Sequence, residues 1–174
     1  MGRRALWVAV AGAGILVAGS LLHRARRAER AGELSQQAAR LLHPPFDEAP
    51  AFSDIRATEA RQLVEEAEEF SVSRDTRRLK VEARAVELLQ RGDAPRARRE
   101  LAGAYTQAPS ELGLLQAAIE LADGKLAAAE SAIDKVLEGA PDPRAFAVAS
   151  DVARATGQAD RALMLAEKGL AVHP

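Results

Sequence analysis

The side chains that most often carry out chemistry are few in this sequence and do not combine into a site. The chain has three histidines, His23, His43 and His173, and no cysteine. No two of the histidines have the i, i+4 spacing with which a helix presents two metal ligands, and no serine pairs plausibly with one of them as a nucleophile. Without cysteine there is no disulfide and no thiolate chemistry. We therefore expect no catalytic residue, metal or cofactor, and predict that the protein is not an enzyme.

Three other patterns resemble ligand sites only in part. Gly12 and Gly14 follow an apolar stretch as in a dinucleotide-binding turn, but Val17 holds the place of the third small residue and no strand–helix alternation follows. The acidic run at 65–69 lacks the loop geometry and further ligands of a calcium site, which leaves a solvated helix face. The basic runs at 77–80 and 96–99 are surrounded by glutamates and lack stacking aromatics, so nucleic acid is not an expected partner.

The elements that remain are helical. The chain has 174 residues, of which 48% are hydrophobic but only 3% aromatic, so Ala, Leu and Val supply most of the apolar content. Ala, Leu, Arg and Glu are all good helix formers, and runs of β-branched residues bounded by turn residues do not occur after residue 20. We predict an all-α protein with one modest domain and an appendage.

The appendage is the segment from Ala5 to Leu22, which contains no charged residue. Eighteen helical residues span roughly 27 Å, close to the ~30 Å hydrocarbon core of a bilayer. Trp7 lies near one end, where an indole can sit among headgroups. We predict that residues 1–23 form a transmembrane anchor in contact with the bilayer through residues 5–22. The basic residues of its two flanks are Arg3, Arg4, Arg24, Arg26 and Arg27.

Two questions about this segment stay open in the sequence. Ala18 and Ser20 could form the cleavage site of a signal peptide, which would leave a secreted protein with a mature N-terminus near Leu21, although four arginines would then be translocated directly afterwards. The arginine bias favours a cytoplasmic domain, and the competing arrangement places the domain outside the membrane. Small residues four apart, such as Ala5, Ala9 and Ala13, also allow association of two anchors into a homo-oligomer.

Residues 24–53 are expected to form a juxtamembrane helix and a proline-rich linker. Leu34, Ala38 and Leu42 share one helical face, and His43-Pro44-Pro45 ends the helix. An acidic helix is then predicted within residues 54–77, capped by Ser53 or Asp54 and continuing to about Phe70.

The remaining residues contain an internal repeat. Glycines recur at positions 92, 124 and 157, spaced by 32 and 33 residues. Each glycine is followed five residues later by an alanine, and each unit closes with a proline. A period near 34 residues is typical of stacked helical hairpins, so we divide the region into units 78–109, 110–141 and 142–174. The landmarks are Gly92, Ala97 and Pro109, then Gly124, Ala129 and Pro141, then Gly157, Ala162 and Pro174.

These landmarks resemble the tetratricopeptide repeat (TPR) family over residues 78–174. The resemblance implies an α-solenoid of helical hairpins, with each glycine ending a helix in a left-handed conformation and each alanine allowing close helix approach. A bulky residue at Ala97 or Ala129 would then overpack the hairpin, at about 1–3 kcal/mol. The second unit departs from the pattern, because Val136 stands where the family has a small residue.

The resemblance also implies a concave groove, lined by the first helix of each hairpin, that binds a peptide or helix of a partner protein. We therefore predict a membrane-anchored adaptor or assembly factor for protein–protein interaction. The alternative is a structural subunit packed permanently within a larger membrane complex. The predicted groove residues are Leu79, Glu82, Val86 and Leu89 in the first unit, Leu114, Leu115, Ala118 and Leu121 in the second, and Arg144, Ala147, Asp151 and Arg154 in the third.

Overall fold

All the regular structure in the described part of the chain is helical, which confirms the predicted all-α class. The computed structural model describes residues 2–43, 52, 56–105, 109–139 and 143–172, without the side chains of 2–19, 105 and 109–111. The helices are α1 (Gly2–Leu42), α2 (Ala57–Phe70), α3 (Arg74–Gln90), α4 (Ala94–Tyr105), α5 (Pro109–Ala122), α6 (Leu126–Leu137), α7 (Pro143–Ala155) and α8 (Ala159–Val172).

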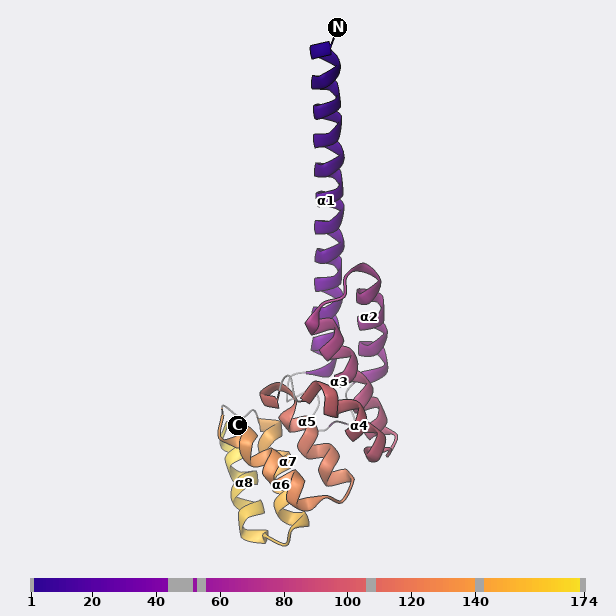
Figure 1. Ribbon diagram of the computed structural model, residues 1–174. Coiled ribbons are helices and arrows are strands. Elements are labelled where there is room, and N and C mark those ends of the chain that lie inside the picture. The colour runs from indigo at the N-terminus through magenta and orange to yellow at the C-terminus, as the bar shows by residue number, and fades with distance from the viewer. Residues whose placement is uncertain (1, 44–51, 53–55, 106–108, 140–142, 173–174) are drawn as a thin grey trace.

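Helix α1 is a single continuous helix of 41 residues that extends far beyond the rest of the molecule (Figure 1). It ends at Leu42, as the following proline pair predicted. The predicted anchor at 5–22 falls, except for its last three residues, outside the residues whose side chains are described. Among the residues that are described, no helix has both the length and the apolar character needed to cross a bilayer.

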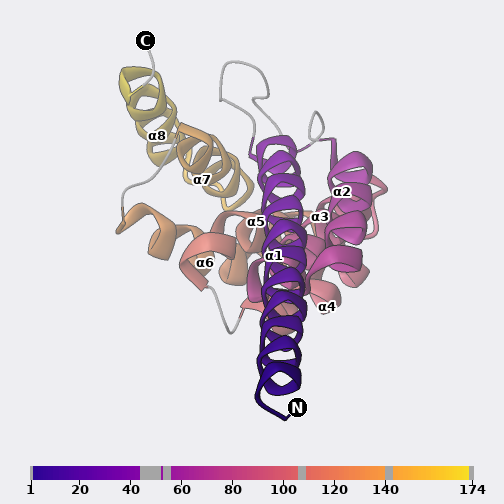
Figure 2. The ribbon, with the colours of Figure 1, turned by 90° about the horizontal axis from the view of Figure 1, so that it is seen from above.

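The C-terminal part of α1 packs against α2, and Figure 2, which views the molecule from above, shows α2 beside it. Ala38 and Leu42 of α1 join Ala60 and Val64 of α2 in one buried cluster, so the predicted apolar face of α1 is confirmed. Helix α2 begins at Ala57, later than the capping residues Ser53 and Asp54 predicted, which lie outside the described residues. Arg56 holds the cap position and makes no side-chain capping hydrogen bond.

Helix α3 begins four residues before the predicted start of the first repeat unit. Ser73 Oγ accepts a hydrogen bond from the Thr76 backbone N–H at 3.0 Å, and the Ser73 N–H donates to Thr76 Oγ1 at 2.8 Å. This reciprocal capping box satisfies two backbone donors at the helix start. The first unit therefore includes residues 74–77, which the sequence had assigned to the acidic segment.

Three hairpins follow, α3–α4, α5–α6 and α7–α8, and each turns at one of the repeated glycines. Gly92, Gly124 and Gly157 have φ angles of 76°, 73° and 77°. In each turn the residue after the glycine donates its backbone N–H to a carbonyl five residues earlier, for example Asp93 to Leu88 at 2.9 Å. This is the Schellman arrangement, in which a left-handed glycine ends the helix. The predicted role of these glycines is confirmed.

The repeated alanines lie in the first turn of the second helix of each hairpin. Ala97 and Ala129 are fully buried, and Ala162 is half-buried. In the second hairpin, a β-carbon at Gly113 of α5 would stand 2.7 Å from Cγ2 of Val136 on α6. In the third hairpin, a β-carbon at Gly169 of α8 would stand 3.1 Å from Cβ of Phe146 on α7. The large side chain and the glycine have thus exchanged helices between the two hairpins, which is how the second tolerates Val136.

Candidate protein-binding surface

The predicted groove positions of the first unit lie in the core. Leu79 and Val86 are buried in the same cluster as Leu42 of α1. Glu82 is 4% exposed, and its Oε1 lies 3.0 Å from Nε2 of His43. The end of α1 therefore covers the face of α3 that the resemblance assigned to a groove. A sequence repeat cannot reveal this cover, because α1 belongs to no predicted unit.

The second unit contributes mainly to the two cores. Leu115 is buried in the first core, between α3, α4 and α5, whereas Leu114 and Leu121 are half-buried against the second core, between α5, α6, α7 and α8. Ala118 is also half-buried. Of the apolar residues predicted to line a groove in this unit, only these half-buried ones keep some exposed surface.

The predicted groove residues that are accessible to solvent lie in the third unit. Arg144 is half-buried, and Ala147, Asp151 and Arg154 are exposed. Nη2 of Arg154 donates to Oδ1 of Asp151 at 2.7 Å, a pair one helical turn apart on α7. The structure therefore brings together charged residues of α7 but does not join them to Leu79, Glu82 or Val86. Their part in partner binding stays a prediction.

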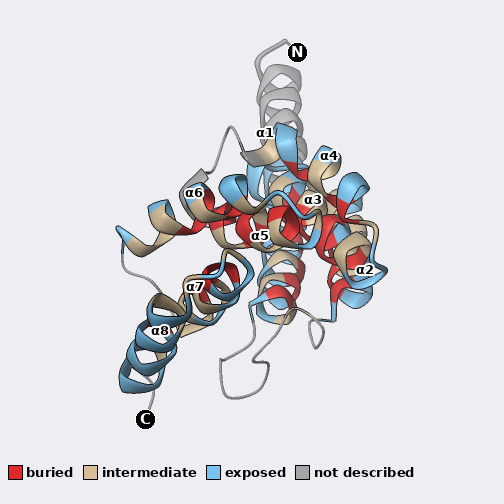
Figure 3. Ribbon diagram, turned by 90° about the horizontal axis from the view of Figure 1, so that it is seen from below, coloured by how far each residue is buried: buried red, intermediate tan, exposed pale blue. Residues whose placement is uncertain are grey.

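A different surface, on α8, was missed by the sequence reasoning. Helix α8 has one buried residue, Leu165, and most of its surface is exposed (Figure 3). Apolar residues on two sides of the helix were a readable signal of a second contact face. The large exposed apolar residues of α8 are Leu163 at 62%, Met164 at 44%, Leu170 at 71% and Val172 at 56%.

Comparison of the three hairpins explains what this surface is. Leu101, Ile133 and Ala166 each follow their turn glycine by nine residues. Leu101 and Ile133 are buried against the helices of the next hairpin, whereas Ala166 is exposed. We call this the stacking face and define it by the residues six, nine and thirteen after each glycine. In the third hairpin the stacking face consists of Leu163, Ala166 and Leu170.

Ion pairs cross the two covered stacking faces. Arg98, six residues after the first glycine, has its Nε 3.4 Å from Oδ2 of Asp123. Glu130, the equivalent residue of the second hairpin, has its Oε1 2.7 Å from Nη1 of Arg161, which also pairs with Asp134. The third hairpin has Leu163 in place of Glu130 and keeps an acid, Glu167, in place of Asp134. Its open face is therefore more apolar, with a carboxylate at one edge.

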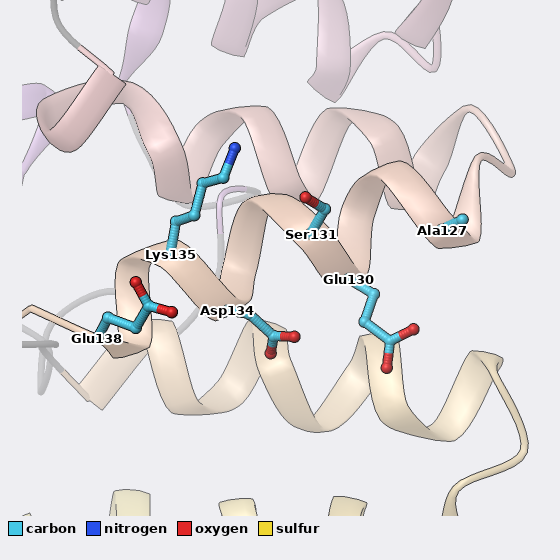
Figure 4. A pocket seen from close by; sticks show the side chains of 6 residues that line it. All are labelled: Ala127, Glu130, Ser131, Asp134, Lys135 and Glu138. Atoms are coloured by element: carbon cyan, nitrogen blue, oxygen red, sulfur yellow. The ribbon is translucent and has the colours of Figure 1, made fainter.

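A shallow depression along α6 offers no comparable site. Its lining residues all lie on this one helix and the residue that follows it, so it is a surface hollow rather than a cleft between elements (Figure 4). Two of its three acids are already paired with Arg161. Within the described residues, no three acidic or histidine side chains form a group that could hold a metal ion. The lining residues are Ala127, Glu130, Ser131, Asp134, Lys135 and Glu138.

One further charged network connects α2 with α3. Arg61 of α2 donates from Nη1 to Oε1 of Glu65 at 2.9 Å and from Nε to Oε2 of Glu87 on α3 at 3.1 Å. The pKa of Arg61 is raised, chiefly by its hydrogen bond to Glu65, while burial acts in the opposite direction. The guanidinium therefore stays charged, and the network joins α2 to α3 without forming a site.

No family model, curated protein or solved structure matches the chain. The resemblance to TPR proteins accordingly stays a prediction, and the function is argued from the surface itself.

Proposed function

We propose that this protein is a membrane-anchored adaptor or assembly factor whose TPR-like hairpins bind a helix of a partner protein. The observation that carries the proposal is the open stacking face of α8. The position nine residues after the glycine is buried by the next hairpin in the first two units, as Leu101 and Ile133, and in the third unit the face consists of apolar residues that no described part of the chain covers. Large exposed apolar residues grouped on one surface are typical of interaction sites.

The covered faces indicate what kind of partner fits. The stacking faces of α4 and α6 are each covered by a helix of the following hairpin. The apolar side chains of that helix pack into the grooves between rows of residues three or four apart. A partner helix with apolar residues at i, i+3 and i+7 would pack in the same way against Leu163, Ala166 and Leu170. A basic side chain at its edge would meet Glu167, as Arg161 meets Asp134 on α6.

The N-terminal segment holds this surface near the membrane. A span at residues 5–22 would confine the hairpins to the membrane plane and raise their effective concentration near membrane partners. The arginines at 24, 26 and 27 are exposed on α1, as expected of residues that stay outside the hydrocarbon. Their charge favours a cytoplasmic domain.

Site-specific photo-crosslinking in the cells that produce the protein tests the proposal. A photoreactive amino acid is placed at Leu163 or Leu170 in the full chain, with exposed Ala102 of α4 as the matched control. We expect both α8 positions to give an adduct with one other protein, and Ala102 to give none. An adduct only at twice the mass of the chain would show self-association instead. Equal adducts from all three positions would contradict a specific surface.

A further inference from the structure

The turn between α2 and α3, residues 71–73, is the part of the domain that reaches furthest along α1 toward its N-terminus (Figure 1). Ala67 near the end of α2 shares a buried cluster with Ala31 and Leu34 of α1. One turn further, Nη2 of Arg27 donates to the backbone carbonyl oxygen of Glu69. These two contacts fix the height of the turn along α1 at about the level of Arg27.

That height is close to the end of the apolar segment. Arg27 follows Leu22 by five helical residues, which corresponds to about 7.5 Å along the axis. The headgroup layer of one leaflet is about 5–7.5 Å thick. If Leu22 marks the edge of the hydrocarbon, the turn therefore lies at the outer edge of the headgroups. A modest tilt of α1 toward α2, within the range usual for membrane helices, would bring the turn into this layer.

The composition of the turn suits such a position. Val72 is 53% exposed, a large apolar side chain at the tip of the domain. Arg74 and Arg77 on the first turns of α3 are exposed, as are Arg24 and Arg26 on the neighbouring stretch of α1. Three exposed acids, Glu29, Glu69 and Asp75, lie on the same segments, so these four arginines leave a small positive excess around Val72. An apolar tip with such an excess fits a bilayer surface that carries anionic phospholipids, which attract nearby basic residues.

We propose that the α2–α3 turn is a second membrane contact, in which Val72 enters the headgroup layer of an anionic bilayer. The inference rests on the proposed membrane anchor, and it adds an orientation to it. With one membrane-spanning helix as the sole contact, α1 and the domain packed on it can rotate and tilt together in the bilayer. Two contacts on one leaflet set the direction of tilt, so that the hairpins project away from the membrane with the α7–α8 hairpin at the far end (Figure 1).

Lipid quenching of a single fluorophore tests this contact, and the chain suits it because it has no cysteine of its own. Cysteine is introduced at Val72, at Leu22 or at Ala159 in the full chain and labelled with an environment-sensitive fluorophore. The protein is placed in nanodiscs of phosphatidylcholine and phosphatidylglycerol, with or without a lipid whose headgroup carries a nitroxide quencher. Leu22 reports the anchor. Ala159 is the matched control, since it is exposed at the start of α8. The α7–α8 hairpin lies at the end of the molecule opposite the N-terminus of α1 (Figure 1).

We expect the nitroxide lipid to reduce the fluorescence of probes at Val72 and Leu22, and to leave the probe at Ala159 unchanged. If Val72 is as unaffected as Ala159 while Leu22 is quenched, the second contact is wrong and the anchor stands. If Leu22 is also unaffected, the anchor and the contact are both wrong. Removing the anionic lipid should weaken quenching at Val72 and leave quenching at Leu22 unchanged.

Discussion

The second and third hairpins have the same backbone plan and solve the same packing problem in opposite ways. Both hairpins turn at a glycine in the left-handed conformation, and in both the two helices approach each other closely at a second glycine. In α5–α6 the glycine is Gly113 on the first helix and faces Val136, whereas in α7–α8 it is Gly169 on the second helix and faces Phe146. What the repeat preserves is therefore the pairing of one glycine with one large side chain and not the residue at either position, as expected for a close-packed interior.

The two hairpins also differ in what covers them. Ile133 on the stacking face of α6 is buried against the next hairpin, whereas the stacking face of α8 is open. One position of the repeat is therefore core in one hairpin and exposed surface in another, depending on whether a described helix packs against it.

The largest expected difference between the hairpins is at this face. Ile133→Ala should destabilise the protein by about 2–5 kcal/mol, because it removes a fully buried side chain and leaves a cavity. Leu170→Ala, at a residue that is 71% exposed, should change stability by less than about 0.5 kcal/mol. Urea unfolding of the full chain in mild detergent, followed by circular dichroism, measures both. Similar losses from the two variants would mean that α8 is covered.

The next largest change in stability is expected at the two glycines that face a large side chain, Gly113 and Gly169. Gly113→Ala should destabilise by about 1–2 kcal/mol, because its new β-carbon meets a stiff β-branched side chain. Adding Val136→Ala should recover part of this loss, with a coupling of at least about 0.5 kcal/mol. Gly169→Ala should be milder, since 3.1 Å to Phe146 leaves more room than 2.7 Å to Val136.

The matched control for this series is Gly103→Ala on α4. A β-carbon there meets no atom within 4 Å, so the change should stabilise the helix by about 0.5–1 kcal/mol. The same urea titrations apply. If Gly113→Ala stabilises the protein as much as Gly103→Ala, the close approach of α5 and α6 is wrong.

The smallest effect concerns the ion pairs that cross the covered face. Arg161→Met should destabilise by about 0.2–1 kcal/mol, because its pairs with Glu130 and Asp134 are partly exposed and screened by solvent. The loss should shrink as salt is added. Arg154→Met, which removes a solvated pair with Asp151 on one helix, should have no measurable effect. An Arg161 loss that is independent of salt would indicate packing of the arginine stem rather than charge.

Much of the fold was readable from local sequence. The turn glycines and the proline pair after Leu42 act through the backbone or the nearest turn of helix, so their effects do not depend on the rest of the molecule. The alanines five residues after each glycine were readable from their spacing. The capping box at Ser73 and Thr76 was equally local and could have been read. The start of α3 at Arg74 was missed because the repeat landmarks drew the boundary at residue 78.

The candidate site was only partly readable, because exposure is a property of neighbours distant in the chain. The residues near Glu82 in the sequence do not predict its contact with His43, yet the end of α1 covers the predicted groove of α3. Leu101 and Ala166 hold the same position of the repeat, and only Leu101 is buried by a following hairpin.

From the sequence alone one can read that this chain is helical, where its repeated hairpins turn and where small residues recur. These features depend on backbone conformation and on spacing within a few residues. The tertiary structure alone decided which apolar faces become core and which stay open. Burial requires a second surface, and the chain provides one for α4 and α6, whereas none of its described residues covers the stacking face of α8.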